Sequence, residues 1–139
     1  NIYLFGAIMG IERRKIRKLI DKIVDFSELR DFVYSPLRDL SSGMVQRLAF
    51  SIIMEVDADI LLLDEMLAFG DIKFKEKCEK ALESSSRNDK TFIVTSHDRE
   101  VIEKFCNKAL LLERGRQVAY GPVNEVLEIY THQRSAESG

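Results

Sequence analysis

Apolar side chains recur at helical spacing near the start of the chain. Between Glu12 and Phe26 they lie three or four positions apart, at Ile16, Leu19, Ile20, Ile23 and Val24. This period predicts an amphipathic helix. Its other face carries most of a basic cluster, which consists of Arg13, Arg14, Lys15, Arg17 and Lys18. A solvated helix surface is the favoured interpretation of that cluster, ahead of a lipid-binding patch.

The rest of the chain breaks this pattern and then alternates between strands and helices. Pro36 and the polar residues up to Gly43 predict a region of turns. Helices are predicted at about Met44–Glu55, Lys73–Leu82, Arg99–Phe105 and Val123–Tyr130. Strands are predicted at Ile60–Leu63 and Thr91–Ser96, and as a hairpin over Lys108–Gly121 that turns at Arg114 and Gly115. This order predicts an α/β fold in which a helical subdomain precedes a largely parallel core.

Two acidic residues end the first predicted strand. The apolar run 60–63 leads without a break into Asp64 and Glu65. Because side chains alternate between the two faces of a strand and neither face is polar here, the run predicts a strand buried on both faces. The next predicted strand ends in the letters TSHD, which contain His97. Ligands of open α/β sheets bind beyond the carboxyl ends of the strands, so these side chains are expected at one edge of the sheet.

Two carboxylates and an imidazole at neighbouring strand ends suit the transfer of a phosphoryl group to water. One acid would hold Mg²⁺, the other would position or deprotonate the attacking water, and the histidine would contact the terminal phosphate. Either element alone is a weak signal. A strand often ends in an acid that caps the next helix, and a lone histidine is usually structural.

A third motif, LSSGMVQR at residues 40–47, places two hydroxyl groups and a glycine just before a predicted helix. The unpaired amides and the dipole at such a helix N-terminus attract anions. A simple serine N-cap is the alternative, and it is favoured when this motif is considered alone.

Composition narrows the possible functions. The 139 residues suffice for one modest domain or for a large part of a bigger one. A net charge of −2 argues against a nucleic-acid groove as the main function. No apolar run approaches the roughly 20 residues of a membrane-spanning helix, so any link to a membrane is expected to pass through a partner. Cys78 and Cys106 have no metal-ligand spacing, which favours unpaired thiols in a reducing compartment.

Four motifs, in their order along the chain, resemble those of the ABC-transporter ATPase family. LSSGM is similar to the signature motif of the family, ILLLDE to its Walker B strand, AFGD to its D-loop and TSHD to its switch histidine. The resemblance implies a P-loop NTPase-type α/β fold, with residues 1–46 in the helical subdomain and residues 47–139 in the ATPase core. It also implies that Asp64 holds Mg²⁺, that Glu65 is the catalytic base and that His97 senses the γ-phosphate of ATP.

The same resemblance implies a homodimer of ATPase subunits. Ser41, Ser42 and Gly43 would contact the γ-phosphate of an ATP molecule that the opposite subunit holds. Asp71 would communicate across the interface between the two subunits.

Several longer stretches narrow the resemblance to the polysaccharide-export subfamily. They are SSGM followed by RLAF, DEMLAFGD followed by FKEKC, NIYLFGAIMG near the start and CNKALLLERGRQVAYGPVNEVLEIY near the end. The implied function is the ATP-driven export of O-antigen, capsule or teichoic acid through an integral-membrane permease, at the cytoplasmic face of the inner membrane. Met66 departs from the residue expected after the glutamate, which is often valine in this subfamily.

The chain contains no phosphate-binding loop of the form G-x-x-x-x-G-K-[ST], because none of its seven glycines is followed by lysine. Truncation upstream of Asn1 is the expected reason, and the chain alone is expected to be inactive. Two alternatives stay open: an ABC ATPase for another cargo, and a non-catalytic module that uses the signature face to dimerise. Intact Glu65 and His97 argue against the second alternative.

Overall fold

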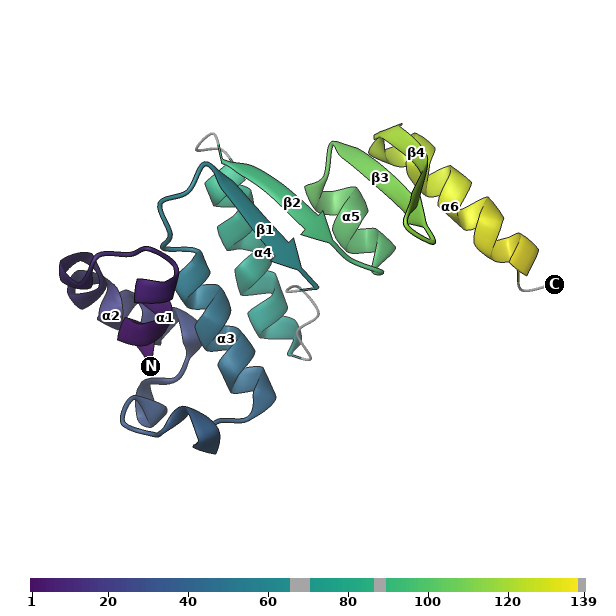
Figure 1. Ribbon diagram of the computed structural model, residues 1–139. Coiled ribbons are helices and arrows are strands. Elements are labelled where there is room, and N and C mark those ends of the chain that lie inside the picture. The colour runs from purple at the N-terminus through teal and green to yellow at the C-terminus, as the bar shows by residue number, and fades with distance from the viewer. Residues whose placement is uncertain (66–70, 87–89, 138–139) are drawn as a thin grey trace. The chain divides into compact units, whose positions relative to one another are not determined.

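The computed structural model describes residues 1–65, 71–86 and 90–137 (Figure 1). Met66 and most of the AFGD motif lie outside these residues. The chain divides into two compact units. Of the described residues, the first contains 1–61, 71–86 and 90–91, and the second contains 62–65 and 92–137.

Three helices form the core of the first unit: α1 (Ile2–Ile8), α2 (Arg13–Ser27) and α3 (Ser42–Ile53). The predicted helix periodicity is confirmed for α2, whose apolar stripe is buried or partly buried. The buried cluster consists of Ile11, Ile16, Ile23, Leu29, Leu48 and Ile52. The pattern of apolar residues did not predict α1, which packs on α2 and α3. A methyl group at Gly6 of α1 would lie 2.6 Å from Cδ1 of the buried Ile16, so only glycine permits this close approach.

Three aromatic rings hold helix α4 (Ile72–Ser86) against α2 and α3. The ring of Phe26 stacks on that of Phe50, with 6.1 Å between centroids, and meets the ring of Phe74 edge-on at 5.9 Å. Two short 3₁₀ turns, η1 (Arg30–Phe32) and η2 (Leu37–Asp39), connect α2 to α3. The turn region predicted from Pro36 to Gly43 contains η2 but not η1.

The second unit contains most of a two-stranded sheet, followed by a hairpin and two helices. Strands β1 (Ile60–Asp64) and β2 (Thr91–Thr95) run parallel (Figure 1), as the sequence predicted. Helix α5 (Arg99–Phe105) leads into β3 (Lys108–Glu113) and β4 (Arg116–Pro122), which pair antiparallel, with Lys108 opposite Pro122 and an irregularity after Leu111. Helix α6 (Val123–Glu137) packs on both strands of this hairpin and is longer than predicted.

The prediction that β1 is buried on both faces is wrong for this chain. Leu61 and Leu63 are buried, whereas Ile60 is 58% exposed and Leu62 is 69% exposed. The side chains alternate between the two faces, as they must in any strand, and the described residues cover only one of these faces. A purely apolar run therefore did not distinguish a strand covered on one side from one covered on both.

Among the described residues, no helix is both long enough and apolar enough to cross a membrane. The two thiols are unpaired, as predicted: Cys78 is buried and Cys106 is partly buried.

We expect Phe50→Ala to lower the free energy of unfolding by about 3–5 kcal/mol, because it removes a fully buried ring (0% exposed) from between two helices. Chemical denaturation measures the change. Tyr34→Ala is the matched control, since Tyr34 is 100% exposed and its loss should change stability by less than about 0.5 kcal/mol. Equal effects of the two substitutions would contradict the aromatic core.

The two thiols should differ in reactivity. Burial raises the pKa of Cys78 to about 12, so almost no thiolate is present at neutral pH. Burial also raises the pKa of Cys106, but this residue is partly exposed. A disulfide reagent should therefore modify Cys106 first in the folded chain, and both thiols only after unfolding. Rapid modification of Cys78 under native conditions would show that α4 is not packed as described.

Candidate functional site

The ends of β1 and β2 bring Glu65 and His97 into direct contact. The backbone N–H of Glu65 donates a hydrogen bond of 3.1 Å to the carbonyl of Thr95, which aligns the two strand ends. Nδ1 of His97 lies 3.0 Å from Oε2 and 3.1 Å from Oε1 of Glu65. The sequence prediction that these residues share one edge of the sheet is confirmed; their chemical roles stay predictions.

The backbone of Glu65 has an unusual conformation. Its φ angle of 52° lies in the left-handed region, which side chains other than glycine rarely adopt. Such a conformation costs on the order of 1 kcal/mol, and residues of this kind concentrate at functional sites. This residue directly follows the last residue of β1, Asp64.

The direction of the hydrogen bond between Glu65 and His97 depends on which nitrogen of the imidazole is protonated. An ionised carboxylate can only accept hydrogen bonds, so a hydrogen bond to ionised Glu65 requires a proton on Nδ1 of His97. Nε2 is then the ring nitrogen that is left to bind another group. The pair therefore places a proton acceptor, the carboxylate of Glu65, beside a second polar group, Nε2 of His97, at an exposed strand end.

Two side chains that sequence reasoning missed support this pair. The hydroxyl of Thr95 donates a hydrogen bond to Oδ1 of Asp64, so the last residues of the two strands are joined through their side chains. Oγ of Ser96 accepts a hydrogen bond of 3.0 Å from the N–H of Asp98, whose carboxylate caps α5 by accepting from the N–H of Glu100. The TSHD letters contained both residues, but only the structure shows that they order the turn around His97.

The signature-like motif lies at the N-terminus of α3, in the first unit. Ser41 is the N-cap residue, and its Oγ accepts a hydrogen bond of 3.3 Å from the N–H of Met44. The capping alternative is thus observed for Ser41. Ser42 and Gly43 are exposed in the first turn of the helix. A methyl group at Gly43 would meet only Oγ of Ser41, at 4.0 Å, so no close contact within the described residues requires glycine there.

Asp71 also belongs to the first unit, where it caps α4. Its Oδ1 accepts hydrogen bonds from the N–H groups of Lys73 (2.9 Å) and Phe74 (3.2 Å). Its Oδ2 accepts from the guanidinium of Arg47 at 2.5 Å. These donors lower the pKa of Asp71, first through the Phe74 amide and then through the Lys73 amide and the Arg47 charge, while partial burial opposes the shift.

Arg47 is the residue that sequence reasoning missed in this unit, although it ends the LSSGMVQR motif. Its guanidinium lies 4.8 Å from the ring centroid of Phe74 and also donates to Glu28 at 3.2 Å. Glu28 in turn accepts from Lys77 at 3.1 Å. Arg47 on α3 thus contacts residues at the end of α2 and at the start of α4. Its charge is largely shielded from water, because only 22% of the side chain is exposed. No pattern in the sequence indicates this network, because its members lie far apart along the chain.

The effect of the Asp71 charge on stability should depend on pH. Because its pKa is lower in the folded chain than its ordinary value of 3.8, its ionisation stabilises the fold above about pH 4, and this stabilisation is lost as the pH falls through the folded-state pKa. Asp71→Asn, which keeps a capping oxygen, should therefore lower the melting temperature at pH 7, and the difference from the parent should shrink toward pH 3. The exposed Asp31→Asn is the control, and a difference for Asp71→Asn that stays constant with pH would contradict the interpretation.

Comparisons with known proteins agree with these features. No family model matches the chain. It is 36% identical over 130 residues to the O-antigen export system ATP-binding protein RfbB of Klebsiella pneumoniae, covering 94% of this chain and 53% of that protein. It is 38% identical to the teichoic acids export ATP-binding protein TagH of Bacillus anthracis, again over 94% of this chain but 24% of the relative. TagH of Staphylococcus epidermidis is 39% identical, with 49% of its length covered.

Solved structures show the fold. The ATP binding subunit of an ABC transporter superimposes with a TM-score of 0.77 at 13% identity, over 94% of this chain and 56% of that one. A bacterial Atm1-family ABC exporter with ATP bound gives a TM-score of 0.70 at 19% identity, over 99% of this chain and 26% of the other. The chain spans about half the length of the Klebsiella relatives. It has part of the ABC ATPase fold and is homologous to the ATP-binding proteins of ABC transporters, among them those of O-antigen and teichoic acid export.

Proposed function

We propose that this chain is part of the ATP-hydrolysing subunit of an ABC exporter that moves a polysaccharide such as O-antigen, capsule or teichoic acid. Two subunits would act together with an integral-membrane permease at the cytoplasmic face of the inner membrane. The names of the relatives support the choice of cargo. The single observation that carries the proposal is the contact between Glu65 and His97 at the ends of two parallel strands.

Glu65 is the proposed base. Its carboxylate accepts a proton from the attacking water, which requires an ionised and accessible group, and the side chain is exposed at the end of β1. In its imidazolium form His97 would donate Nδ1–H to that carboxylate and so orient it, and would donate Nε2–H to the terminal phosphate. One imidazole thus connects the base to the phosphate that the water attacks.

Asp64 fits Mg²⁺. Thr95 occupies Oδ1, which leaves Oδ2 as a hard oxygen ligand of the kind this ion prefers. Among the described residues, no group of three or more acidic, histidine or cysteine side chains could hold a metal ion. The single carboxylate of Asp64 is compatible with Mg²⁺, because this ion commonly binds through one or two carboxylates together with phosphate oxygens and water. When bound, Mg²⁺ would neutralise and orient the phosphates of ATP.

The N-terminus of α3 is the proposed contact with ATP held by the second subunit. Ser42 and Gly43 are exposed there, and the amides of the first helical turn attract anions. A glycine at position 43 would let a phosphate approach the backbone closely. This role would explain the glycine, because no close contact within the described residues excludes a larger side chain there. Asp71 would act across the same subunit interface. In this proposal residues 1–46 belong to the helical subdomain and residues 47–139 to the ATPase core.

In a complete ATPase subunit that contains this chain, Glu65→Gln should lower the hydrolysis rate by about 10²–10⁴-fold, because the amide keeps the shape but cannot accept the proton. ATP binding should persist, and ATP should hold the dimer together. Phosphate release and light scattering measure the two effects. Glu113→Gln, an exposed glutamate at the end of β3, is the matched control. Near-normal hydrolysis by Glu65→Gln would refute the assignment of the base.

The cargo needs a separate test. Cells in which Glu65→Gln replaces the parent should lack the exported polysaccharide on their surface, while cells carrying Glu113→Gln should display it. Normal surface polysaccharide in both would assign the ATPase to another cargo, even if the chemistry of Glu65 is as proposed.

A further inference from the structure

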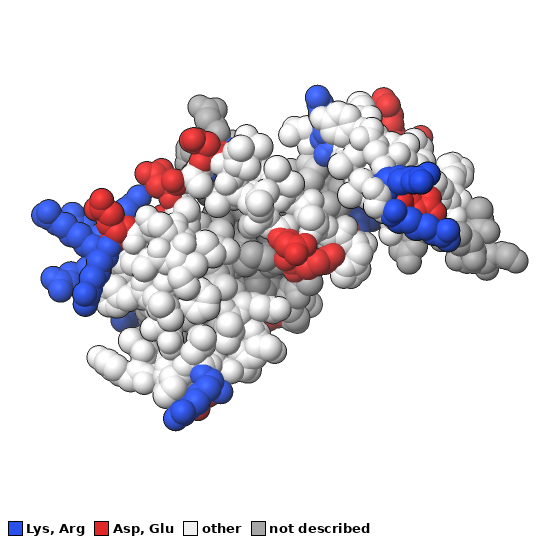
Figure 2. All heavy atoms as spheres, viewed as in Figure 1, with Lys and Arg blue, Asp and Glu red and all other residues white. Residues whose placement is uncertain are grey.

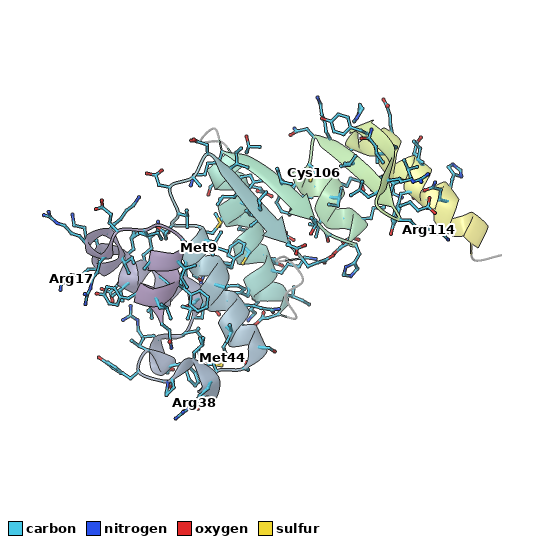
Figure 3. The ribbon with its side chains drawn as sticks, viewed as in Figure 1. Met9, Arg17, Arg38, Met44, Cys106 and Arg114 are labelled. Atoms are coloured by element: carbon cyan, nitrogen blue, oxygen red, sulfur yellow. The ribbon has the colours of Figure 1, made fainter. Side chains whose placement is uncertain are left out.

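The basic cluster at the start of α2 forms an exposed patch. Figure 2 shows positive side chains gathered over this part of the chain, and Figure 3 shows Arg17 extending from α2 away from the neighbouring helices. Arg13, Arg14, Lys15, Arg17 and Lys18 are all exposed. The whole chain nevertheless carries a net charge of −2, so the patch is a local concentration of charge.

Three of these side chains form no ion pair, hydrogen bond or ring contact within the described residues. Lys15 lies 3.6 Å from the carboxylate of Asp57, and the guanidinium of Arg13 lies 5.5 Å from the ring centroid of Tyr3. Arg14, Arg17 and Lys18 form no ion pair or hydrogen bond within the described ranges. We name these three residues the α2 basic patch.

The position of the patch is unfavourable for the helix itself. The first turn of α2 contains no acidic residue, and its basic side chains lie near the positive end of the helix dipole. Arg14 and Lys18 are four residues apart, so like charges face each other on one side of the helix. Asp21, one turn after Arg17, is the acidic residue of α2 nearest to the patch, and it lies 3.6 Å from Arg30, so the patch charges stay available to a partner outside the helix.

We propose that the α2 basic patch binds the anionic headgroups of a lipid surface. The apolar face of α2 is already buried, with Ile16 and Ile23 each 1% exposed, so the helix cannot insert and its contact with lipid is electrostatic. A diffuse layer of negative charge requires no matching shape, and each nearby Lys or Arg adds to the attraction.

The size of the patch matches the range of the interaction. The stretch from Arg14 to Lys18 rises roughly 6 Å along the helix. The Debye length at physiological salt is about 8 Å, so the three charges act together but only within close range of the surface. The contact is therefore weak and salt-dependent. It would orient a protein that is already held near a membrane, and it does not rest on the proposed ATP site.

Flotation of the chain with lipid vesicles tests the proposal, because aggregates sink whereas vesicle-bound protein rises. The chain should float with vesicles containing about a third phosphatidylglycerol and stay unbound with phosphatidylcholine alone. Salt at ~0.5 M should release it. The combined substitution Arg14→Gln, Arg17→Gln and Lys18→Gln should weaken partitioning on the order of 100-fold.

Two control proteins keep the test decisive. Lys80→Gln, Arg114→Gln and Arg116→Gln remove the same charge from exposed positions elsewhere and should leave partitioning unchanged. Arg14→Lys with Arg17→Lys should also float, since charge alone is required, and the triple patch variant should melt no lower than the parent. Flotation that is independent of lipid charge or of the patch would overturn the proposal. Tighter binding to duplex DNA or polyglutamate than to anionic vesicles would overturn it too.

Discussion

The parallel pairing of β1 with β2 is the constraint on which the candidate site depends. The N–H of Thr91 donates to the carbonyl of Asp59 at one end, and the N–H of Glu65 donates to the carbonyl of Thr95 at the other. Because both strands run in the same direction, their carboxyl ends meet, and the residues that follow each strand become neighbours. The contact between Glu65 and His97 is a direct result of this backbone register.

The first unit depends on a different kind of interaction. Its helices are joined by an apolar cluster and three aromatic rings, and Arg47 then links them through charge. This arginine packs on Phe74 and forms ion pairs with Glu28 and Asp71. It therefore links α3, which begins at the signature-like motif, to the start of α4. Charged groups that are partly shielded interact more strongly than exposed pairs, which gives this network more influence on the local geometry than a surface ion pair has.

Particular elements show where sequence reasoning succeeds and where it does not. The period of the apolar residues located α2 to within a residue at each end, and the α5 prediction matches the observed helix. The hairpin turn at Arg114 and Gly115 was also predicted, and both residues have positive φ angles. Helix α1 was missed because its short run of apolar residues has no polar face to mark a helical period; Gly6 and Ile16 become neighbours only when the two helices pack. The exposed face of β1 was missed because the sequence of a strand does not show whether other elements cover one of its faces or both.

The sequence by itself determined the local elements, the order of the motifs and the chemical types of the site residues, because periodicity and side-chain chemistry are properties of consecutive letters. It also placed Asp64, Glu65 and His97 at strand ends, from which their proximity could be predicted. The tertiary structure decided the rest. The left-handed backbone of Glu65, the support of Asp64 by Thr95 and the Arg47 network each join residues distant in sequence or depend on how the chain leaves a strand. Such features arise from packing and hydrogen bonding between segments, which no single segment encodes.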